Sequence, residues 1–160
     1  MDGEEGESFC IVERSARRLA LPAAAVCRVL SGGTLTRVPA GPAAVVGLVN
    51  DRGAALPVVC IDAWLRLTPR PCASGDPVVV VEGGGLRFGL LVDRVDGVAP
   101  LAGVTDALID FDADRAPHLI GASRASGRGP VAVLDPDALA QAAVAAADAA
   151  FGAPSGDRAA

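Results

Sequence analysis

Few side chains in this chain have the types and spacing that catalysis requires. The only histidine, His118, could activate a serine, but the sequence has no Gly-x-Ser-x-Gly turn to present one. Asp93 and Asp96 could be paired for acid–base chemistry, but with no partner acid or base beside them they fit the edge of a strand better. We expect no catalytic residue. An enzyme that uses His118 or a cysteine is the alternative, and removal of these residues would test it.

A zinc site is not indicated either. Zinc needs several cysteine or histidine ligands at short spacing, whereas the four cysteines here are scattered and form no C-x-x-C pair. Because the chain has no secretory signal, we expect these thiols to be reduced and mostly buried. They are Cys10, Cys27, Cys60 and Cys72.

Two further patterns resemble ligand sites but lack a required residue. Asp110, Asp112 and Asp114 have the spacing that begins a calcium loop, but Arg115 stands where glycine must make the sharp turn. The glycines at 83–85 precede a strand instead of a helix, so they direct no helix N-terminus at a phosphate. We therefore expect no metal and no cofactor, but a solvated acidic loop and a hairpin turn.

Arg52 is a charged residue in the turn at residues 50–53, and none of the catalytic or ligand patterns above includes it. Asn50 and Asp51 bond readily to their own backbone and Gly53 accepts a positive φ, so this turn between two apolar runs predicts a β-hairpin. A tight turn does not require an arginine. The charge of Arg52 is therefore available for binding, and the alternative is a solvated turn charge.

The overall composition excludes several classes of partner. The net charge is −5 and the pI is about 4.7, with one Trp and no Tyr, which disfavours nucleic-acid binding through basic patches or base stacking. The acidic N-terminus lacks the basic start and apolar block of a secretory signal. No run of about 18 apolar residues is present to span a membrane. We expect a cytoplasmic protein, whose 160 residues, 51% of them hydrophobic, suffice for one domain.

The apolar runs around Arg52 are short and β-branched, which predicts a mainly β domain at residues 8–151 with disordered tails at 1–7 and 152–160. Asp135 begins a C-terminal helix that runs to about Phe151, and Asp62 is a candidate N-cap for a helix at 63–67. Expected strands cover 8–14, 19–21, 35–38, 47–49, 54–61, 78–81, 86–92, 94–98, 119–123 and 130–134, with 23–30 either a helical turn or a strand.

The two halves of the chain resemble each other weakly. The matching stretches are 11–13 with 80–82, 26–29 with 92–95, and 59–62 with 132–135. Each half would be a hairpin-rich sheet closed by a helix, so the spacing suggests two small antiparallel barrels. The alternative is chance similarity between short β units in a chain rich in Ala and Val.

One sequence pattern spans most of the chain. In the first half it comprises Leu21-Pro22, Val26-x-x-Val29-Leu30, Val38-Pro39, Pro42, Gly47-Leu48-Val49-Asn50-x-Arg52-Gly53 and Leu56-Pro57-Val58-Val59. In the second half it comprises Val78–Val81, Phe88-Gly89-Leu90-Leu91-Val92-Asp93-x-Val95-x-Gly97-Val98, Leu119-Ile120-Gly121 and Val133-Leu134-Asp135. The pattern covers roughly residues 8–145, and its most specific part is the Asn-x-Arg-Gly turn. It resembles the pattern of the CheW-like family, the adaptors of bacterial chemosensory arrays.

The resemblance implies a CheW-like fold, which is mainly β, with two small five-stranded SH3-like β-barrels that share a core and a C-terminal α-helix. It implies a cytoplasmic adaptor without enzymatic activity that couples chemoreceptors to a CheA-type histidine kinase in bacterial chemotaxis. The alternative is an adaptor of a non-chemotactic chemosensory pathway, such as surface motility or development.

The resemblance implies two protein partners. We expect no nucleic-acid partner and no direct insertion into a membrane. The hairpin tip of a chemoreceptor would bind in a groove between the barrels, and the regulatory domain of the kinase would bind barrel against barrel. Carried over by position, the receptor-facing residues are Val26, Arg28, Gly47, Arg52 and Gly53, together with Phe88 and Gly89 from the second barrel.

Three positions depart from the family pattern. Arg28 stands where a glutamate is often paired with the turn arginine, and Arg28 and Arg52 would repel each other by about 1 kcal/mol if exposed and close. We therefore expect an acidic residue, on the partner or nearby, that serves both. Asp51 replaces an apolar residue. Cys60 stands where an aspartate usually ends the strand, and Asp62 is a candidate to take over that cap.

Overall fold

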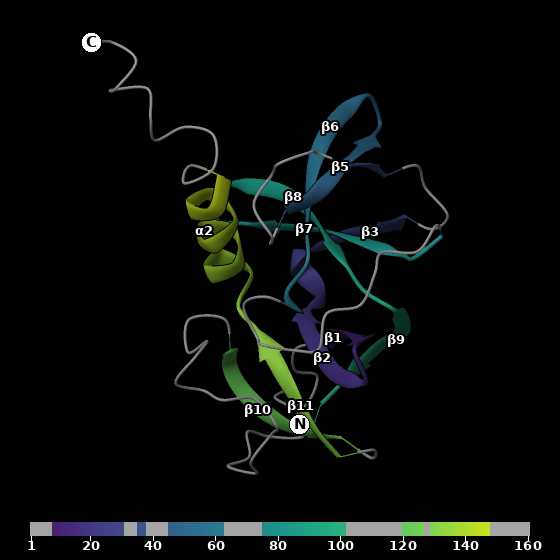
Figure 1. The fold of residues 1–160 in the computed structure, drawn as a ribbon. Helices are drawn as coiled ribbons and strands as arrows, with labels where there is room; N and C mark the ends of the chain where they lie inside the picture. Colours follow the sequence, from purple (N-terminus) through teal and green to yellow (C-terminus); the bar gives the residue numbers. More distant parts are fainter. Residues whose placement is uncertain are drawn as a thin grey trace, which may run out of the picture.

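The computed structural model describes residues 8–30, 35–37, 45–62, 75–101, 120–126 and 129–147, which form two β-sheets and one α-helix (Figure 1). The strands are β1 (Ser8–Arg14), β2 (Arg17–Pro22), β3 (Val26–Leu30), β4 (Thr36–Arg37), β5 (Val45–Asp51), β6 (Ala54–Val59), β7 (Val78–Gly83), β8 (Leu86–Leu91), β9 (Arg94–Pro100), β10 (Ile120–Ser126) and β11 (Gly129–Leu134). The helical elements are a 3₁₀ turn, η2 (Ala23–Ala25), and the α-helix α2 (Pro136–Ala147).

The strands divide into two sheets. Sheet A has five strands in the order β10-β11-β2-β1-β9, and sheet B has six in the order β3-β7-β8-β6-β5-β4. In Figure 1 sheet B occupies the upper part of the molecule beside α2, and sheet A the lower part. The prediction of a mainly β fold with two sheets and a C-terminal helix is confirmed. The sixth strand of sheet B, β4, is a two-residue strand within the predicted 35–38.

The two sheets have a similar topology, and each contains strands from both halves of the chain. A hairpin lies within each, β1–β2 in sheet A and β7–β8 in sheet B. The second strand of each hairpin pairs in parallel with another strand, β11 or β6. The strand after each hairpin crosses to the other sheet, so that β3 pairs with β7 and β9 pairs with β1. The predicted repeat is therefore present in the topology, and each sheet combines strands from both halves.

The pairing registers correct one detail of the predicted repeat. Val26 pairs with Val81 and Val95 pairs with Val12, and each of these ladders contains a bulge next to that pair. Since Val12 and Val81 hold the same place in their hairpins, Val26 corresponds to Val95. The sequence match to 92–95 was three residues early, because the letters Val-x-Arg-Val recur there.

Both sheets and the helix contribute to one shared core. Leu19 of β2, Phe88 and Leu90 of β8, and Leu139 of α2 belong to a single buried cluster, and none is more than 2% exposed. Smaller clusters lie within sheet B and within sheet A. The central strands β1, β2, β7 and β8 are therefore buried on both faces, with one face in the shared core and the other in the smaller cluster of their own sheet.

The helix α2 begins as the sequence predicts. A side-chain oxygen of Asp135 accepts hydrogen bonds from the backbone N–H groups of Asp137 (3.0 Å) and Ala138 (3.4 Å), which is the N-cap arrangement. The Asp137 carboxylate accepts a bond from the N–H of Gly84 (2.7 Å) and so ties the β7–β8 turn to the helix.

The region predicted as a helical turn or a strand contains both. The 3₁₀ turn η2 covers Ala23–Ala25 and β3 follows directly from Val26. The expectation of mostly buried thiols is correct for Cys10 and Cys60, but Cys27 is exposed, because it lies at the bulge of the β3 ladder. These three thiols are free.

Several predictions lie outside the described residues. They are the tails at 1–7 and 152–160, the helix at 63–67, Cys72, the acidic loop at 110–114, His118, and the end of the C-terminal helix beyond Ala147.

Candidate functional site

The turn around Arg52 joins β5 to β6 as predicted, and its backbone is left-handed. Arg52 has φ = 56° and Gly53 has φ = 88°, so both central residues are left-handed, as in a type I′ hairpin turn. The side-chain oxygen of Asn50 accepts a bond from the N–H of Gly53 (2.8 Å). Glycine or asparagine is favoured in this conformation, and a longer side chain there costs about 1 kcal/mol. Arg52 is thus held at a position that local backbone energetics disfavour.

Arg52 lies at the surface next to a buried acid. Arg52 is exposed, whereas Asp51 is only 4% exposed. Within the described part of the chain, no residue forms an ion pair with Arg52. Its charge therefore faces solvent at the tip of the β5–β6 hairpin.

Arg28 finds its partner in Asp51. One oxygen of the Asp51 carboxylate lies 2.8 Å from Nη1 of Arg28, and the Arg28 side chain is 22% exposed. An acidic residue near Arg28 was predicted, and this part of the prediction is confirmed. The predicted repulsion between Arg28 and Arg52 is thereby reduced, since the acid that neutralises Arg28 precedes Arg52 in the chain.

The two glycines of this hairpin are required by the backbone, for different reasons. A Cβ atom on Gly47 would overlap the carbonyl oxygen of Thr36, where β4 crosses close to β5. Gly53 has open space around it, but its positive φ disfavours a side chain. Gly47 is buried and Gly53 is exposed, so only Gly53 belongs to the surface beside Arg52.

The remaining predicted site residues lie deeper. Val26 is partly buried and packs against the shared core. Phe88 is 2% exposed and belongs to that core, so its side chain offers no surface to a partner. A Cβ on Gly89 would lie 2.6 Å from Cγ1 of Val78, which makes Gly89 a packing position. The structure therefore connects Arg28, Arg52 and Gly53 through Asp51 and the turn, whereas Phe88 and Gly89 are packing positions, because both faces of β8 are covered at these residues.

Apolar side chains are exposed on the same two strands. Val29 of β3 is 42% exposed and Leu48 of β5 is 37% exposed. The Arg28–Asp51 pair joins these two strands, which have no backbone ladder with each other among the described strands.

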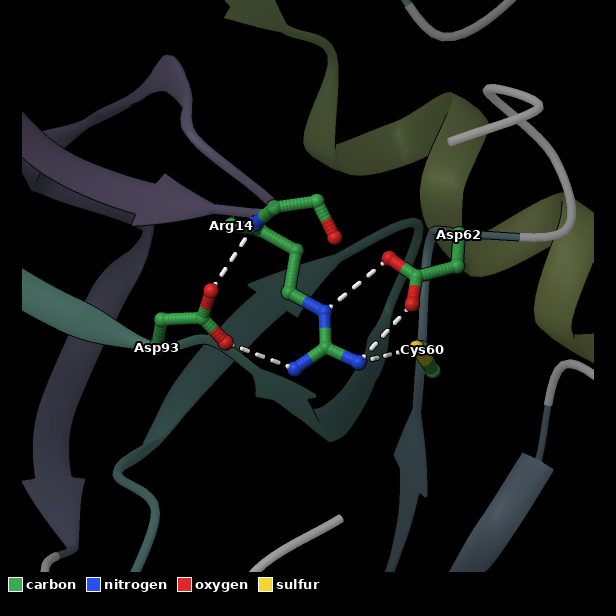
Figure 2. A network of polar contacts seen from close by, with 5 residues as sticks. Arg14, Cys60, Asp62 and Asp93 are labelled. Atoms are coloured by element: carbon green, nitrogen blue, oxygen red, sulfur yellow. Dashed lines mark hydrogen bonds and ion pairs between the residues drawn. The ribbon is translucent and has the colours of Figure 1, made fainter. Parts of the chain in front are cut away.

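A second arginine cluster was not predicted from the sequence. Arg14 ends β1 with 0% exposure, and its guanidinium lies between two carboxylates (Figure 2). Nε and Nη2 donate to the two oxygens of Asp62 at 2.9 Å and 2.8 Å, and Nη1 donates to Asp93 at 2.8 Å. Nη2 also lies 3.3 Å from the sulfur of Cys60. All three nitrogen atoms of the guanidinium therefore have a partner.

This cluster joins three segments that are distant in sequence. Asp62 and Cys60 follow β6 of sheet B, and Asp93 stands where the chain crosses from β8 to β9. The second oxygen of Asp93 accepts a bond from the N–H of Ser15 (2.9 Å), and the N–H of Asp93 donates to the carbonyl of Glu13 (2.8 Å). Asp93 therefore fixes the β1–β2 turn to the crossover between the sheets.

The electrostatics of this cluster follow from burial and pairing. Burial alone would lower the pKa of Arg14, but the hydrogen bond with Asp62 and the neighbouring negative charges raise it above its usual value. Burial raises the pKa of the Cys60 thiol, although the Arg14 charge opposes this shift. The thiol is therefore neutral and the guanidinium charged, which suits a structural cross-link and not a nucleophile.

Three aspartates in or near this cluster were predicted as a helix cap or at a strand edge, and their contacts are as follows. Both oxygens of Asp62 accept bonds from Arg14, and the helix that Asp62 was expected to cap lies outside the described residues. Asp96 accepts a bond from Nε of Arg94 (2.9 Å) at the edge strand β9, as expected for a strand edge. Asp93 was also assigned to a strand edge, and its contact with Arg14 was not foreseen.

The described residues form neither a cluster of metal ligands nor a helix that could span a membrane. Among the described residues, no three His, Cys, Asp or Glu side chains come together as metal ligands would. No helix in the described part is long and apolar enough to cross a membrane.

Comparison with known proteins connects this fold to one family. A family model for the CheW-like domain matches residues 8–144. The chain is 31% identical to Protein FrzA of Myxococcus xanthus over 125 residues, which is 77% of each chain. It is 34% identical to a probable chemotaxis protein CheW of Rhizobium etli over 74 residues, or 46% of each chain.

A solved structure has the same fold. The crystal structure of the scaffolding protein TtCheW from Thermoanaerobacter tengcongensis superposes with a TM-score of 0.69 at 18% identity, over 82% of this chain and 90% of that one. This likeness concerns the fold, and the family match covers most of the chain. The chain therefore belongs to the CheW-like family and is a non-catalytic scaffold protein of chemotaxis-type signalling.

Proposed function

We propose that this protein couples a chemoreceptor to a CheA-type histidine kinase, and that the β5–β6 hairpin faces the receptor. The family membership supports the two classes of partner. The observation that carries the receptor assignment is Arg52, which is exposed at a turn whose left-handed backbone disfavours arginine. Strained residues of this kind concentrate at binding sites.

The proposed surface consists of Arg52 and Gly53 at the hairpin tip, with Arg28 behind them and Val29 and Leu48 on the adjoining strands. Val26, Gly47, Phe88 and Gly89 are packing positions and not part of this surface, because each lies against the core or another strand. Hot spots at protein interfaces are enriched in arginine and surrounded by apolar contacts, and this surface has both.

The test is a binding measurement with a soluble coiled-coil fragment of the cytoplasmic tip of a chemoreceptor from the same genome, and with the regulatory domain of its kinase. Arg52→Asn removes the charge and suits the left-handed turn, so the fold is kept. We expect receptor binding to weaken by about tenfold or more, a loss of about 1.4 kcal/mol, with kinase binding unchanged.

The matched control is Arg87→Asn, because Arg87 is an exposed arginine of the β7–β8 hairpin whose contact with Glu82 is at the surface. This variant should bind the receptor fragment as the wild type does. A folded Arg52→Asn protein with unchanged receptor binding would show that the hairpin tip is not the contact.

The output of the pathway is a separate question. One curated relative is named as a chemotaxis protein, and the name of the relative matched over the longer span states no output. We propose chemotaxis as the output. A deletion strain that keeps its response to chemical gradients but loses surface motility would favour the non-chemotactic alternative.

A further inference from the structure

The Arg28–Asp51 pair connects two strands that are far apart in sheet B. The strand order places β7, β8 and β6 between β3, which carries Arg28, and β5, which ends at Asp51. The only described backbone ladder of β3 is the one with β7. The 2.8 Å contact between Nη1 of Arg28 and the Asp51 carboxylate therefore draws the first and fifth strands of the sheet together across a seam without backbone hydrogen bonds.

The geometry of the pair leaves little of it to a partner. The side chain of Asp51 is 2% exposed, and that of Arg28 is 22% exposed. The contact is a single hydrogen bond, and Nε of Arg28 is buried without a hydrogen-bond partner. The pair is thus an internal contact that is not optimised for stability, since a buried donor without a partner is unfavourable.

The position of Arg52 depends on this pair. Asp51 and Arg52 are consecutive, and an inward carboxylate at the end of β5 leaves the next side chain at the outer tip of the turn. Without the pair, a buried carboxylate would lack a counter-charge, and the end of β5 would separate from β3 to hydrate it. The contact therefore fixes the hairpin tip relative to β3.

We infer that Arg28 is a positioning residue and not a contact residue: its bond to Asp51 holds the β5–β6 hairpin against β3, and Arg52 alone presents the positive charge. The partner surface opposite Arg52 accordingly carries a carboxylate. This inference rests on the proposed function for the identity of the partner, but the positioning role can be measured without any partner.

The first experiment measures hydrogen exchange at the backbone N–H of Gly53, which reports on the closed turn because it bonds to Asn50. Arg28→Met should accelerate this exchange by about tenfold or more, because it leaves Asp51 buried and unpaired. Arg28→Met combined with Asp51→Leu replaces the pair with apolar side chains and should restore exchange to within about threefold of the wild type. Unchanged exchange in Arg28→Met would overturn the inference.

A further single variant tests the same contact if the double variant does not fold. Asp51→Asn keeps the shape of the side chain and removes its charge, so it too should accelerate exchange at Gly53. Arg52→Asn should not accelerate that exchange, because it leaves the Arg28–Asp51 pair in place and suits the left-handed turn. If Asp51→Asn exchanges like the wild type, the pair does not hold the hairpin.

The second experiment measures binding of the same receptor fragment to these variants. We expect Arg28→Met to weaken binding and the double variant to recover it to within about threefold of the wild type, since a positioning role needs the hairpin in place and not the charge at Arg28. If the double variant recovers hydrogen exchange but binds as weakly as Arg28→Met, then Arg28 touches the partner and the inference is wrong, while the proposed function stands.

Failure of the proposed function would look different. In that case Arg52→Asn would bind the fragment as the wild type does, and the exchange data would still decide the role of Arg28. The carboxylate on the partner is tested by salt. Binding by the wild type should weaken as ionic strength rises, and this dependence should be smaller in Arg52→Asn than in Arg87→Asn. Binding that strengthens with salt would contradict an acidic partner surface.

Discussion

Arg14 and Arg52 occupy opposite environments in the same small protein. Arg14 is fully buried and bonds to two carboxylates and a thiol, whereas Arg52 is exposed, left-handed and without an ion pair in the described part of the chain. Arg14 joins the two sheets, and Arg52 extends from one hairpin. The contrast shows how to separate a structural arginine from a recognition arginine, since the first has its partners within the fold and the second needs one from outside.

The pair Arg28–Asp51 is intermediate between these two. It resembles the Arg14 cluster in using a buried carboxylate, but it has one hydrogen bond where Arg14 and its carboxylates have three. It lies beside the exposed arginine and sets its position. The three arginines thus differ in burial and in the number of internal partners, from Arg14 through Arg28 to Arg52. Variants can test each of them.

The largest effect is expected at Arg14. Arg14→Met should lower the free energy of unfolding by about 3–5 kcal/mol, because it leaves the buried Asp62 and the partly buried Asp93 without a counter-charge. Chemical denaturation measures this loss. The control Arg87→Met, at an exposed arginine, should change stability by less than about 0.5 kcal/mol. A loss at Arg14 no larger than the control would show that the cluster does not fasten the two sheets.

The buried thiols should make the free energy of unfolding depend on pH, with a smaller effect than the loss of Arg14. Burial raises the pKa of Cys10 and of Cys60, so both thiols stay neutral in the folded state at a pH where the unfolded chain ionises. Their contribution to stability is complete below the usual thiol pKa of 9.0 and is lost as pH rises above it. Each thiol should lower stability by about 1.4 kcal/mol per pH unit in that range.

This pH dependence can be assigned by substitution. The slope above pH 9.0 should be smaller in a Cys10→Ala, Cys60→Ala protein than in the wild type. With Cys72 replaced by serine, a thiol reagent should label the exposed Cys27 in the folded protein and the two buried thiols only on unfolding. Equal slopes in the double variant and the wild type would contradict the assignment.

The smallest effect is expected at Arg52, and it has the opposite sign. Arg52→Asn should raise stability by about 1 kcal/mol, because asparagine adopts the left-handed conformation more readily than arginine. The measurement is again chemical denaturation. A gain in stability together with a loss of receptor binding would show that the strain at this turn is kept for recognition, whereas a loss of stability would indicate that Arg52 has a structural contact.

Local sequence signals were sufficient for most of the fold. Asn50 and Gly53 predict the β5–β6 turn, the glycines at 84 and 85 allow the β7–β8 turn, and Asp135 begins the helix, because each acts on the backbone within a few residues. The acid near Arg28 was expected from charge repulsion alone, and Asp51 supplies it.

The buried cluster and the inward position of Phe88 could not be predicted in the same way. Arg14 meets Asp62 across 48 residues and Asp93 across 79, and these contacts form only once β9 has crossed to sheet A. Phe88 was carried over as a surface residue, but its face of β8 turns to the shared core. Both outcomes depend on which strands become neighbours, which periodicity in one strand does not determine.

The crossing of β3 and β9 has a consequence for how such a protein can arise and be divided. Each sheet combines strands from both halves, so a single half would leave both edges of its hairpin without their partner strands, and β3 or β9 without a ladder. Two copies of an ancestral half could satisfy these needs by exchanging the pairings, as a symmetric dimer. Fusion of the two copies would then make the exchange permanent within one chain, and fragments cut between β6 and β7 should regain structure only when mixed.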